Sequence, residues 1–376
     1  MEESDLATDQ PVASSTGWGS WLRDWTVVVP CIGAAAVAVT WGFKEISPVL
    51  AVVVGLLLAA SVLAAVHHAE VVAHRVGEPF GSLVLAVAVT VIEVALIVTL
   101  MVSGGPETAS LARDTVFAAV MITCNGILGA SVLISALRDR VSTFNAEGTA
   151  TALATVATLT TLSLVLPTFT TSAEGQQFTG GQLAFAALAS LVLYGVFVLV
   201  QTIRHRDHFL PAGDDGLTDA HDAPSDRRAL ASLGLLLVAL VAVVGLAKVE
   251  SPAVETGVLA IGAPASAVGV VIAMLVLLPE MLAAVRNARR GRVQTSMNLA
   301  LGSAIASIGL TIPAIAVASI WLEGPLILGL EPTQLVLFAI TMLVGSLTVL
   351  PGRATVQEGA VHLVLLGAFL LLAVIP

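Results

Sequence analysis

Two glutamates stand near the middle of apolar stretches of this chain, where a charged side chain is expensive to keep. Glu93 lies within FGSLVLAVAVTVIEVALIVTLM and Glu280 lies within LVLLPEMLAAV. An apolar run of about 20 residues can cross the ~30 Å hydrocarbon core of a bilayer as a helix. A charge at its centre costs on the order of 2.5–3.5 kcal/mol on insertion scales, so such acids usually face a partner or a water-filled pathway. We therefore predict that Glu93 and Glu280 form one ion and metal site.

Paired carboxylates in a membrane have the chemistry to exchange cations for protons. Two buried carboxylates that face each other are not both ionised cheaply unless a cation lies between them. One Ca²⁺ or two protons neutralise the pair equally, so metal and protons compete for the same groups. This competition gives exchange if the empty ionised site is too costly to move between its inward-facing and outward-facing states. A proton gradient directed inward would then drive cation extrusion.

Further oxygen ligands are needed to complete such a site. Ca²⁺ takes 6–8 oxygens, of which two bidentate carboxylates supply about four. Carbonyls near Pro279, which lacks an amide hydrogen, and water are candidate ligands. The predicted supporting side chains are Thr90, Asn125, Ser303 and Ser307. Hydrogen bonding between helices is the alternative role for these polar residues and for the two glutamates. A site this sparse also suits Na⁺ or K⁺.

Other ionisable residues lie nearer the ends of the apolar stretches. Glu78, Glu147 and His74 stand at predicted cytoplasmic ends, where they serve either in cation access and proton relay or as ordinary solvated interfacial charges. His362 lies in the last apolar stretch, and we expect it to pack between helices. Trp25 and Trp41 flank the first apolar stretch and fit interfacial anchoring.

The composition predicts the class of protein that positions these residues. Hydrophobic residues make up 57% of the 376 residues and charged residues only 11%, against about 25% charged in ordinary soluble domains. The fold class expected is therefore an all-α integral membrane protein whose principal partner is the lipid bilayer. No nucleic-acid partner or cofactor is expected. Cys31 and Cys124 both lie in apolar runs and form neither a disulfide framework nor a thiolate metal site.

Eleven transmembrane helices are predicted. Their ranges are 25–43, 48–67, 80–102, 114–137, 148–168, 181–203, 229–248, 257–285, 294–321, 333–350 and 357–375. Lys and Arg concentrate in cytoplasmic loops. With these ranges, only Lys44, Arg113 and Lys248 of the 16 Lys and Arg residues fall on the side opposite the N terminus. The N terminus is therefore predicted to be cytoplasmic and the C terminus external.

The predicted helices divide into two similar halves. We expect a cytoplasmic tail at 1–24, one extra helix at 25–47, a five-helix repeat at 48–203, an acidic cytoplasmic linker at 204–228 and a second five-helix repeat at 229–376. Because each half has five helices, the halves enter the membrane from opposite sides, and inverted repeats place substrate sites near the midplane. The linker is either a solvated hinge or a cation-attracting regulatory segment, and its spacing is not that of an EF-hand.

Together these features resemble the calcium/cation antiporter superfamily, and in particular its bacterial calcium/proton or sodium-potassium/proton branch. The resemblance rests on EPFGSLVLAVAVTVIEVALI and LPEMLAAVRNARRGRVQTSMNLALGSAIASIGLTIPA. It implies that Glu93 and Glu280 are the acidic pair, with Asn125, Ser303 and Ser307 at the polar positions of the helices that follow. It also implies a multi-pass protein of a bacterial cytoplasmic membrane that extrudes Ca²⁺, and also Na⁺ or K⁺, in exchange for protons.

One departure from the family pattern bears on cation selectivity. Calcium-selective relatives show G-N-[AT]-x-E before each glutamate, whereas Thr90 and Leu277 occupy the asparagine positions here. Antiport of monovalent cations alone is therefore an alternative to calcium/proton exchange. Na⁺/Ca²⁺ exchange and a cation channel are less favoured alternatives. An enzyme is not expected, because the sequence has no H-E-x-x-H or G-x-S-x-G motif.

Overall fold

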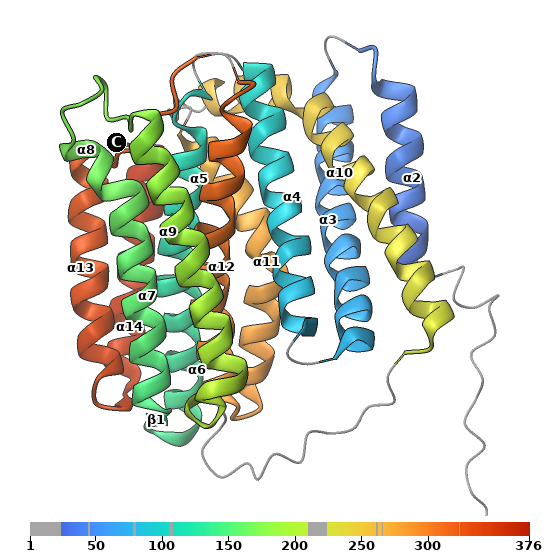
Figure 1. Cartoon of the computed structure of the whole chain (residues 1–376). Helices are drawn as coiled ribbons and strands as arrows, with labels where there is room; N and C mark the ends of the chain where they lie inside the picture. The colour runs from blue at the N-terminus through green and yellow to red at the C-terminus, as the bar shows by residue number, and fades with distance from the viewer. Residues whose placement is uncertain are drawn as a thin grey trace, which may run out of the picture.

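The computed structural model is almost entirely helical (Figure 1). It describes residues 24–43, 46–77, 80–104, 108–209, 224–260, 262–264, 266–322 and 324–376. Glu78, nearly all of the N-terminal tail and the middle of the predicted linker, 210–223, lie outside the described residues. In Figure 1 the helices that begin at Trp25 and at Asp226 start at the lower end of the molecule, and the C terminus lies at its upper end. We name these two ends the linker side and the C-terminal side.

The helices of the first half cross the molecule alternately. The elements are α2 (Trp25–Thr40), α3 (Pro48–Val76), α4 (Phe80–Gly104), α5 (Leu111–Met121), the π-helix η2 (Ile122–Ile127), α6 (Leu128–Asp139), α7 (Ala146–Thr160), the π-helix η3 (Thr161–Val165), α8 (Leu166–Phe169), α9 (Gly180–Leu199), the π-helix η4 (Val200–Arg204) and the 3₁₀ helix η5 (Arg206–Phe209). Segments α5, η2 and α6 form one continuous crossing, as do α7, η3 and α8.

The second half contains five long helices. They are α10 (Asp226–Ala260), α11 (Ala267–Arg289), α12 (Val293–Ala318), α13 (Pro332–Val349) and α14 (Val356–Val374). Two strands of two residues each, β1 (Ser142–Thr143) and β2 (Arg353–Ala354), pair antiparallel on the linker side with Ser142 opposite Ala354. This short ladder joins the turn after α6 to the turn after α13 and leaves the fold all-α.

Ten helices of the described chain are long and apolar enough to cross a bilayer. The helix α2, with 16 residues, is shorter than these. With α2 counted, the prediction of eleven membrane helices is confirmed. The chain is therefore a multi-pass membrane protein.

The predicted boundaries are wrong at two places. Helix α3 continues to Val76 rather than ending at 67, and α10 continues to Ala260, so that α11 starts ten residues later than the predicted 257. Helix α10 does not end at Glu250, because the side chain of this residue is buried against α3 near Gly55. The helix ends before Gly262, whose φ of +72° is a left-handed conformation that favours glycine.

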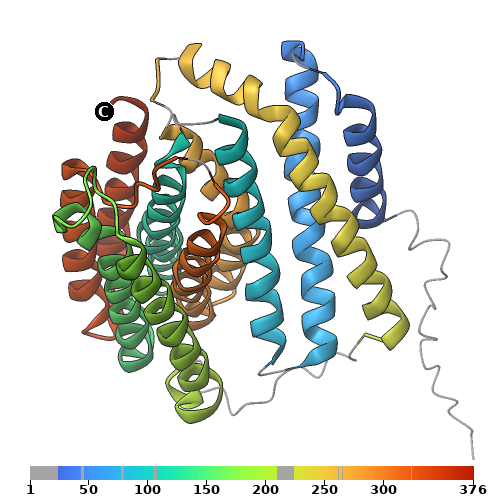
Figure 2. The same cartoon turned by 45° about the horizontal axis from the view of Figure 1, so that its top comes forward.

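The packing of the two halves is that expected of inverted repeats. The second helix of each half packs on the third crossing of the other half: α4 on α12, and α11 on α5 and α6. The fifth helices behave alike, since α9 packs on α12 and α14 packs on α6. The first helices of the two halves, α3 and α10, pack mainly on each other and, with α2, form one edge of the molecule (Figures 1 and 2).

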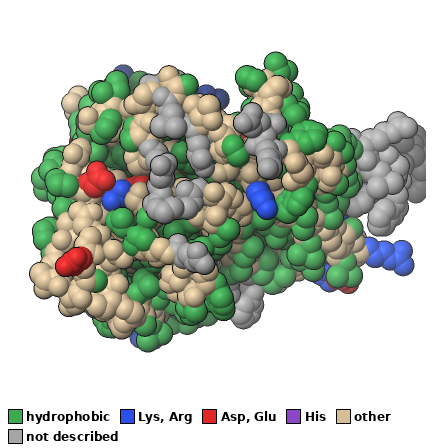
Figure 3. All heavy atoms as spheres, turned by 90° about the horizontal axis from the view of Figure 1, so that it is seen from above, with side chains coloured by type: hydrophobic (Ala, Val, Ile, Leu, Met, Phe, Trp, Pro, Cys, Tyr) green, Lys and Arg blue, Asp and Glu red, His purple; other side chains and the backbone are tan. Residues whose placement is uncertain are grey.

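The surface fits a membrane environment. Many large apolar side chains are exposed on the outer helices, among them Val49, Leu56, Phe185 and Val364. Figure 3 views the C-terminal side, where only scattered Asp, Glu, Lys and Arg side chains are visible among hydrophobic ones. The sparse positive charge visible there agrees with the uneven distribution of Lys and Arg in the sequence.

Candidate ion-binding site

A cavity of about 470 Å³ lies between α4, α9, α11 and α12. Glu93 and Glu280 both line it, and they belong to opposite halves of the chain. Three of the predicted supporting residues, Thr90, Ser303 and Ser307, line it as well. The structure thus brings the two glutamates together near the middle of the molecule, as the sequence predicts.

The carboxylate of Glu93 is held by a side chain from the other half. The hydroxyl of Ser307 on α12 donates a hydrogen bond of 2.7 Å to Oε1 of Glu93, and Glu93 is only 3% exposed. One turn further along α12, the buried hydroxyl of Thr311 faces the same carboxylate without a hydrogen bond of ordinary geometry. Ser307 therefore fixes this end of the site in position, and Thr311 offers a second hydroxyl beside Glu93.

Glu280 is less constrained than Glu93. Its Oε2 atom is buried without a hydrogen-bond partner, although the side chain lines the cavity. A buried polar atom without a partner costs about 1–3 kcal/mol, and much more if it is charged. Helix α11 remains continuous through Pro279, which cannot donate to the carbonyl one turn earlier. The free carboxyl oxygen of Glu280 is therefore the natural position for a proton or a cation.

The cavity extends from the glutamates toward the linker side. Its other polar lining residues are Gln201 at the end of the α9 crossing, Asn287 near the end of α11, and Thr295 and Asn298 near the start of α12. All four are partly exposed and lie at the linker-side ends of their helices. The polar pathway thus leads from the glutamate pair to one side only.

On the C-terminal side α11 is packed tightly against α5. A Cβ atom at Gly269, in the first turn of α11, would lie 2.8 Å from the amide nitrogen of Thr115 on α5. Beside this contact, Arg113 forms an ion pair of 2.8 Å with Asp114 and one of 3.2 Å with Glu331 at the start of α13. These contacts hold α5, α11 and the start of α13 together on the C-terminal side.

Asn125 lies away from the cavity, in a separate buried network. Its amide nitrogen donates to Thr341 at 2.9 Å, and its amide oxygen is 3.0 Å from Nδ1 of His362. Because the amide oxygen is an acceptor, Nδ1 of His362 carries the hydrogen, and Nε2 then accepts from Thr348 at 3.1 Å. The proposed ligand role of Asn125 thus has no support from its contacts. His362 packs between helices as expected, and it also bonds to η2 through Asn125.

Replacement of Asn125 by alanine tests this assignment. We expect Asn125→Ala to destabilise the protein, at about 1–3 kcal/mol for each buried partner left unbonded, because Thr341 and His362 both lose a hydrogen bond. The midpoint of thermal unfolding in detergent measures this loss. Thr158→Ala is the control, since Thr158 is exposed and bonds only to its own helix. Unchanged stability together with lost transport would instead make Asn125 part of the ion site.

The remaining predicted residues lie elsewhere. Glu147 is exposed at the start of α7, contacts His208 and does not line the cavity, so it contributes no ligand there. His74 is exposed near the linker-side end of α3. Their predicted roles in access or proton relay are not tested by these positions.

Two further acids lie in long helices although the sequence did not predict them there. Glu250 is 9% exposed, and its Oε2 has no hydrogen-bond partner. Glu70, on α3, interacts electrostatically with Glu280. Both were assigned to loops because the preceding apolar runs already reached membrane-spanning length. The signal that would have found them is the continuation of helix-forming, small and apolar residues beyond each acid.

Gly302 forms part of the cavity wall, which provides a test of the pathway. No atom lies within 4 Å of a Cβ placed there, so Gly302→Ala should fold and transport normally. Gly302→Leu fills the cavity beside Ser303, and we expect it to slow cation flux by about tenfold or more, since misplacements of about 1 Å at a site have effects of this size. Gly195→Leu is the matched control, because Gly195 is equally open but lies outside the cavity lining. Normal flux in Gly302→Leu would exclude this cavity as the route.

Comparisons with known proteins agree with this fold. A sequence model of the family described as "Sodium/calcium exchanger protein" matches residues 46–203 and 231–375. The protein y4hA of Sinorhizobium fredii, provisionally named an ionic transporter, is 47% identical over 94% of this chain and 96% of its own. The sodium-potassium/proton antiporter ChaA of Escherichia coli is 32% identical over 93% and 96%. The crystal structure of the H⁺/Ca²⁺ exchanger CAX superposes with a TM-score of 0.66 and 16% identity, over 92% of this chain and 87% of its own.

Proposed function

Because this chain belongs to the sodium/calcium exchanger protein family, we propose that it is a secondary active antiporter that exchanges a cation, Ca²⁺, Na⁺ or K⁺, for protons. We place it in a bacterial cytoplasmic membrane, with the linker side in the cytoplasm. The preference of Lys and Arg for cytoplasmic loops supports this orientation. An inward proton gradient would drive cation extrusion.

The observation that carries the proposal is the glutamate pair. Glu93 and Glu280 come from inverted halves and line one cavity, and a carboxyl oxygen of Glu280 has no bonding partner there. Two carboxylates in so apolar a setting require compensation by protons or by a cation. Each species displaces the other from the same oxygens, so the occupied site is always close to neutral. That is the condition for coupled exchange.

The packed C-terminal side supports an alternating-access mechanism. In the orientation proposed, the cavity opens to the cytoplasm, and the contacts of Gly269 and Arg113 hold the helices of the external side together. An outward-facing state would require the equivalent contacts to form on the linker side. Helices α3 and α10 are suited to this rearrangement, because they pack mainly on each other at the edge of the molecule.

Two considerations bear on the transported cation. The charges of two ionised carboxylates match one Ca²⁺, but Ca²⁺ prefers 6–8 oxygen ligands. With Asn125 bonded elsewhere, the side-chain oxygens that remain beside the glutamates are the hydroxyls of Thr90, Ser303 and Ser307, which line the cavity, and that of Thr311, which faces Glu93. The relative ChaA is named a sodium-potassium/proton antiporter. The ligand set therefore fits Na⁺ or K⁺ at least as well as Ca²⁺.

The decisive experiment uses the purified full chain in proteoliposomes with an acidic interior. Addition of Ca²⁺, Na⁺ or K⁺ should collapse the pH gradient if the cation is transported, and the labelled cation should accumulate inside against its own gradient. Collapse with Ca²⁺ assigns calcium/proton exchange, and collapse with Na⁺ or K⁺ alone assigns monovalent exchange. Cation movement without coupled proton movement would identify a channel. If protein-containing and protein-free liposomes behaved alike for all three cations, the proposed function would be wrong.

A further inference from the structure

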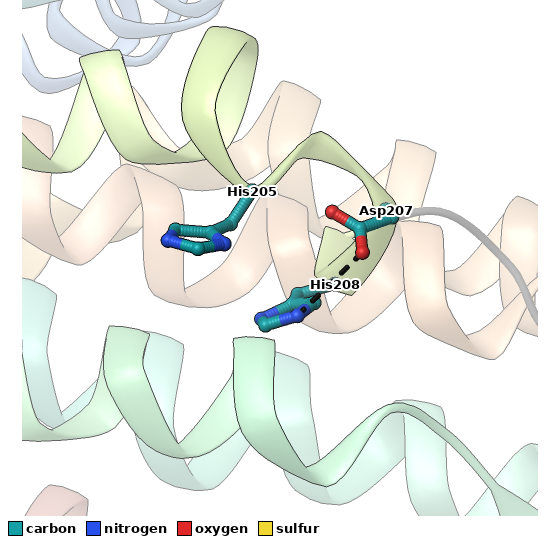
Figure 4. Close-up of side chains that lie close together, drawn as sticks. All are labelled: His205, Asp207 and His208. Atoms are coloured by element: carbon teal, nitrogen blue, oxygen red, sulfur yellow. Dashed lines mark ion pairs between the residues drawn. The ribbon is translucent and has the colours of Figure 1, made fainter.

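A second cluster of possible metal ligands lies on the linker side, outside the cavity. His205 lies between η4 and η5, and Asp207 and His208 lie in η5 (Figure 4). One ligand atom from each residue lies within 4.8 Å of the others. The two imidazole rings are stacked, with centroids 5.0 Å apart and planes inclined by 27°. Nε2 of His208 is 3.6 Å from Oδ2 of Asp207.

A fourth side chain contacts one member of the cluster, His208, from another helix. Oε2 of Glu147, in the first turn of α7, is 3.3 Å from Nε2 of His208. Zinc ligands at about 2.0–2.2 Å in tetrahedral geometry lie roughly 3.3–3.6 Å from one another. The separations from His208 to Glu147 and to Asp207 therefore already equal those between ligands that share one metal ion. A simple ion pair does not require both carboxylates to approach the same nitrogen.

We propose that His205, Asp207 and His208, with Glu147 beside His208, form a binding site for a divalent transition metal of the zinc class, separate from the transport site. Imidazole nitrogens favour Zn²⁺ and its transition-metal neighbours, whereas Ca²⁺ and Mg²⁺ favour sites built from oxygen alone. The donor set also contrasts with the cavity, where the charged ligands are both carboxylates. The two sites would thus select different metals.

The position of the cluster connects it to the mouth of the cavity. The backbone of η5 lies directly on α7, because a Cβ atom at Gly148 would clash with the carbonyl oxygen of His208. On its other side, the carbonyl of Phe209 accepts a hydrogen bond from Asn298, which lines the cavity. A bound metal would fasten η5 to α7 and so hold Asn298 and the start of the acidic linker in place. We infer that metal binding slows transport.

Metal binding is tested first on the purified full chain in detergent. Calorimetric titration with Zn²⁺ should show one site, and Co²⁺ should give the visible absorption of a tetrahedral complex. His205→Ala and His208→Ala should each weaken binding by about tenfold or more, and Glu147→Gln less. His74→Ala is the matched control, because this histidine is on the same side but outside the cluster. Binding that persists in the His205→Ala/His208→Ala double variant would overturn the site.

The double variant Glu93→Gln/Glu280→Gln separates this site from the transport site. It should bind Zn²⁺ as the native chain does, even though it does not exchange cations. Loss of Zn²⁺ binding in this variant would place the metal in the cavity and overturn the proposal. Retained metal binding with no transport of any cation in the native chain would leave the metal site standing while the proposed function fails.

Regulation is tested in proteoliposomes by the ratio of the transport rates with and without micromolar Zn²⁺, which is supplied on the side of the membrane that the linker side of the protein faces. This ratio should fall well below one for the native chain and return to one for His205→Ala/His208→Ala. A native chain that binds the metal but transports equally fast with and without it would overturn the link to the cavity. Equal inhibition in both proteins would assign the effect of Zn²⁺ to the transport site.

Discussion

Replacement of Glu280 by glutamine is expected to lower the rate of cation/proton exchange by a factor between about 30 and more than a thousand. Removing one member of a buried charged pair typically costs 2–5 kcal/mol, and each 1.4 kcal/mol is a factor of ten. Glutamine keeps the shape of the side chain, so Glu280→Gln should fold. However, it no longer exchanges a proton for a cation at the oxygen that has no partner in the structure. Collapse of an imposed pH gradient in proteoliposomes measures the effect.

The same substitution at Glu93 should also abolish exchange, but with a different effect on stability. The hydroxyl of Ser307 donates to Oε1 of Glu93, and the amide oxygen of glutamine accepts that bond equally well. The unfolding midpoint of Glu93→Gln should therefore equal or exceed that of the native protein, since the substitution removes a buried ionisable group. Glu280→Asp is the control, because it keeps a carboxylate at a displaced position and should retain measurable exchange. Native exchange rates in both glutamine variants would contradict the paired-carboxylate site.

Replacement of Arg113 by leucine is expected to cause the largest loss of stability, about 3–5 kcal/mol, because it leaves a buried charge without its partner. Arg113 and Asp114 are each 3% exposed, and the ion pair between them measures 2.8 Å. Arg113 also donates to the carbonyl of Gly329 and pairs with Glu331, whose side chain is largely exposed and remains hydrated without it. The unfolding midpoint in detergent, measured with and without added lipid, reports the loss.

A second substitution separates the lost ion pair from lost packing. Asp114→Asn removes the orphaned charge, while its amide still has Ser110 and Gln334 as partners. The double variant Arg113→Leu/Asp114→Asn should therefore be clearly more stable than Arg113→Leu alone. Equal stability of the single and double variants would show that the arginine acts through packing rather than charge. Glu331→Gln should be almost silent, because exposed ion pairs contribute about 0–1 kcal/mol.

The glutamate pair was predictable because the cost of an acid in an apolar helix is a local property of the sequence. Glu93 and Glu280 each stand alone in a run long enough to cross the bilayer, and Ser307 lies in the polar helix that follows Glu280. The contacts of Asn125 were not predictable in this way. Its partners Thr341 and His362 lie 216 and 237 residues further along the chain. Nothing local distinguishes an amide that bonds to them from one that faces an ion.

The same distinction explains the success and the errors in the helix boundaries. The number of crossings follows from length, hydrophobicity and the side on which Lys and Arg fall, all of which are properties of single segments. The extension of α10 past Glu250 depends on its packing against α3 near Gly55. Burial of this kind is a tertiary property, so the sequence alone suggested a loop. For the linker that contains His205, Asp207 and His208, the sequence left a hinge and a cation-attracting segment open, and it did not indicate the contact with Glu147, which comes from a different helix.

The short first helix has a consequence for the membrane itself. Its 16 residues rise about 24 Å, less than the ~30 Å of an average hydrocarbon core. Exposed tryptophans mark both of its ends, Trp25 and Trp41, and the ring of Trp41 is held under the Lys248 ammonium at 4.3 Å. Because tryptophan prefers the headgroup level, we expect the lipid layer beside α2 to thin toward it. Helix α2 packs on α3 and α10, the two helices that we expect to move during transport. The length of the lipid acyl chains should therefore affect the movement of these two helices.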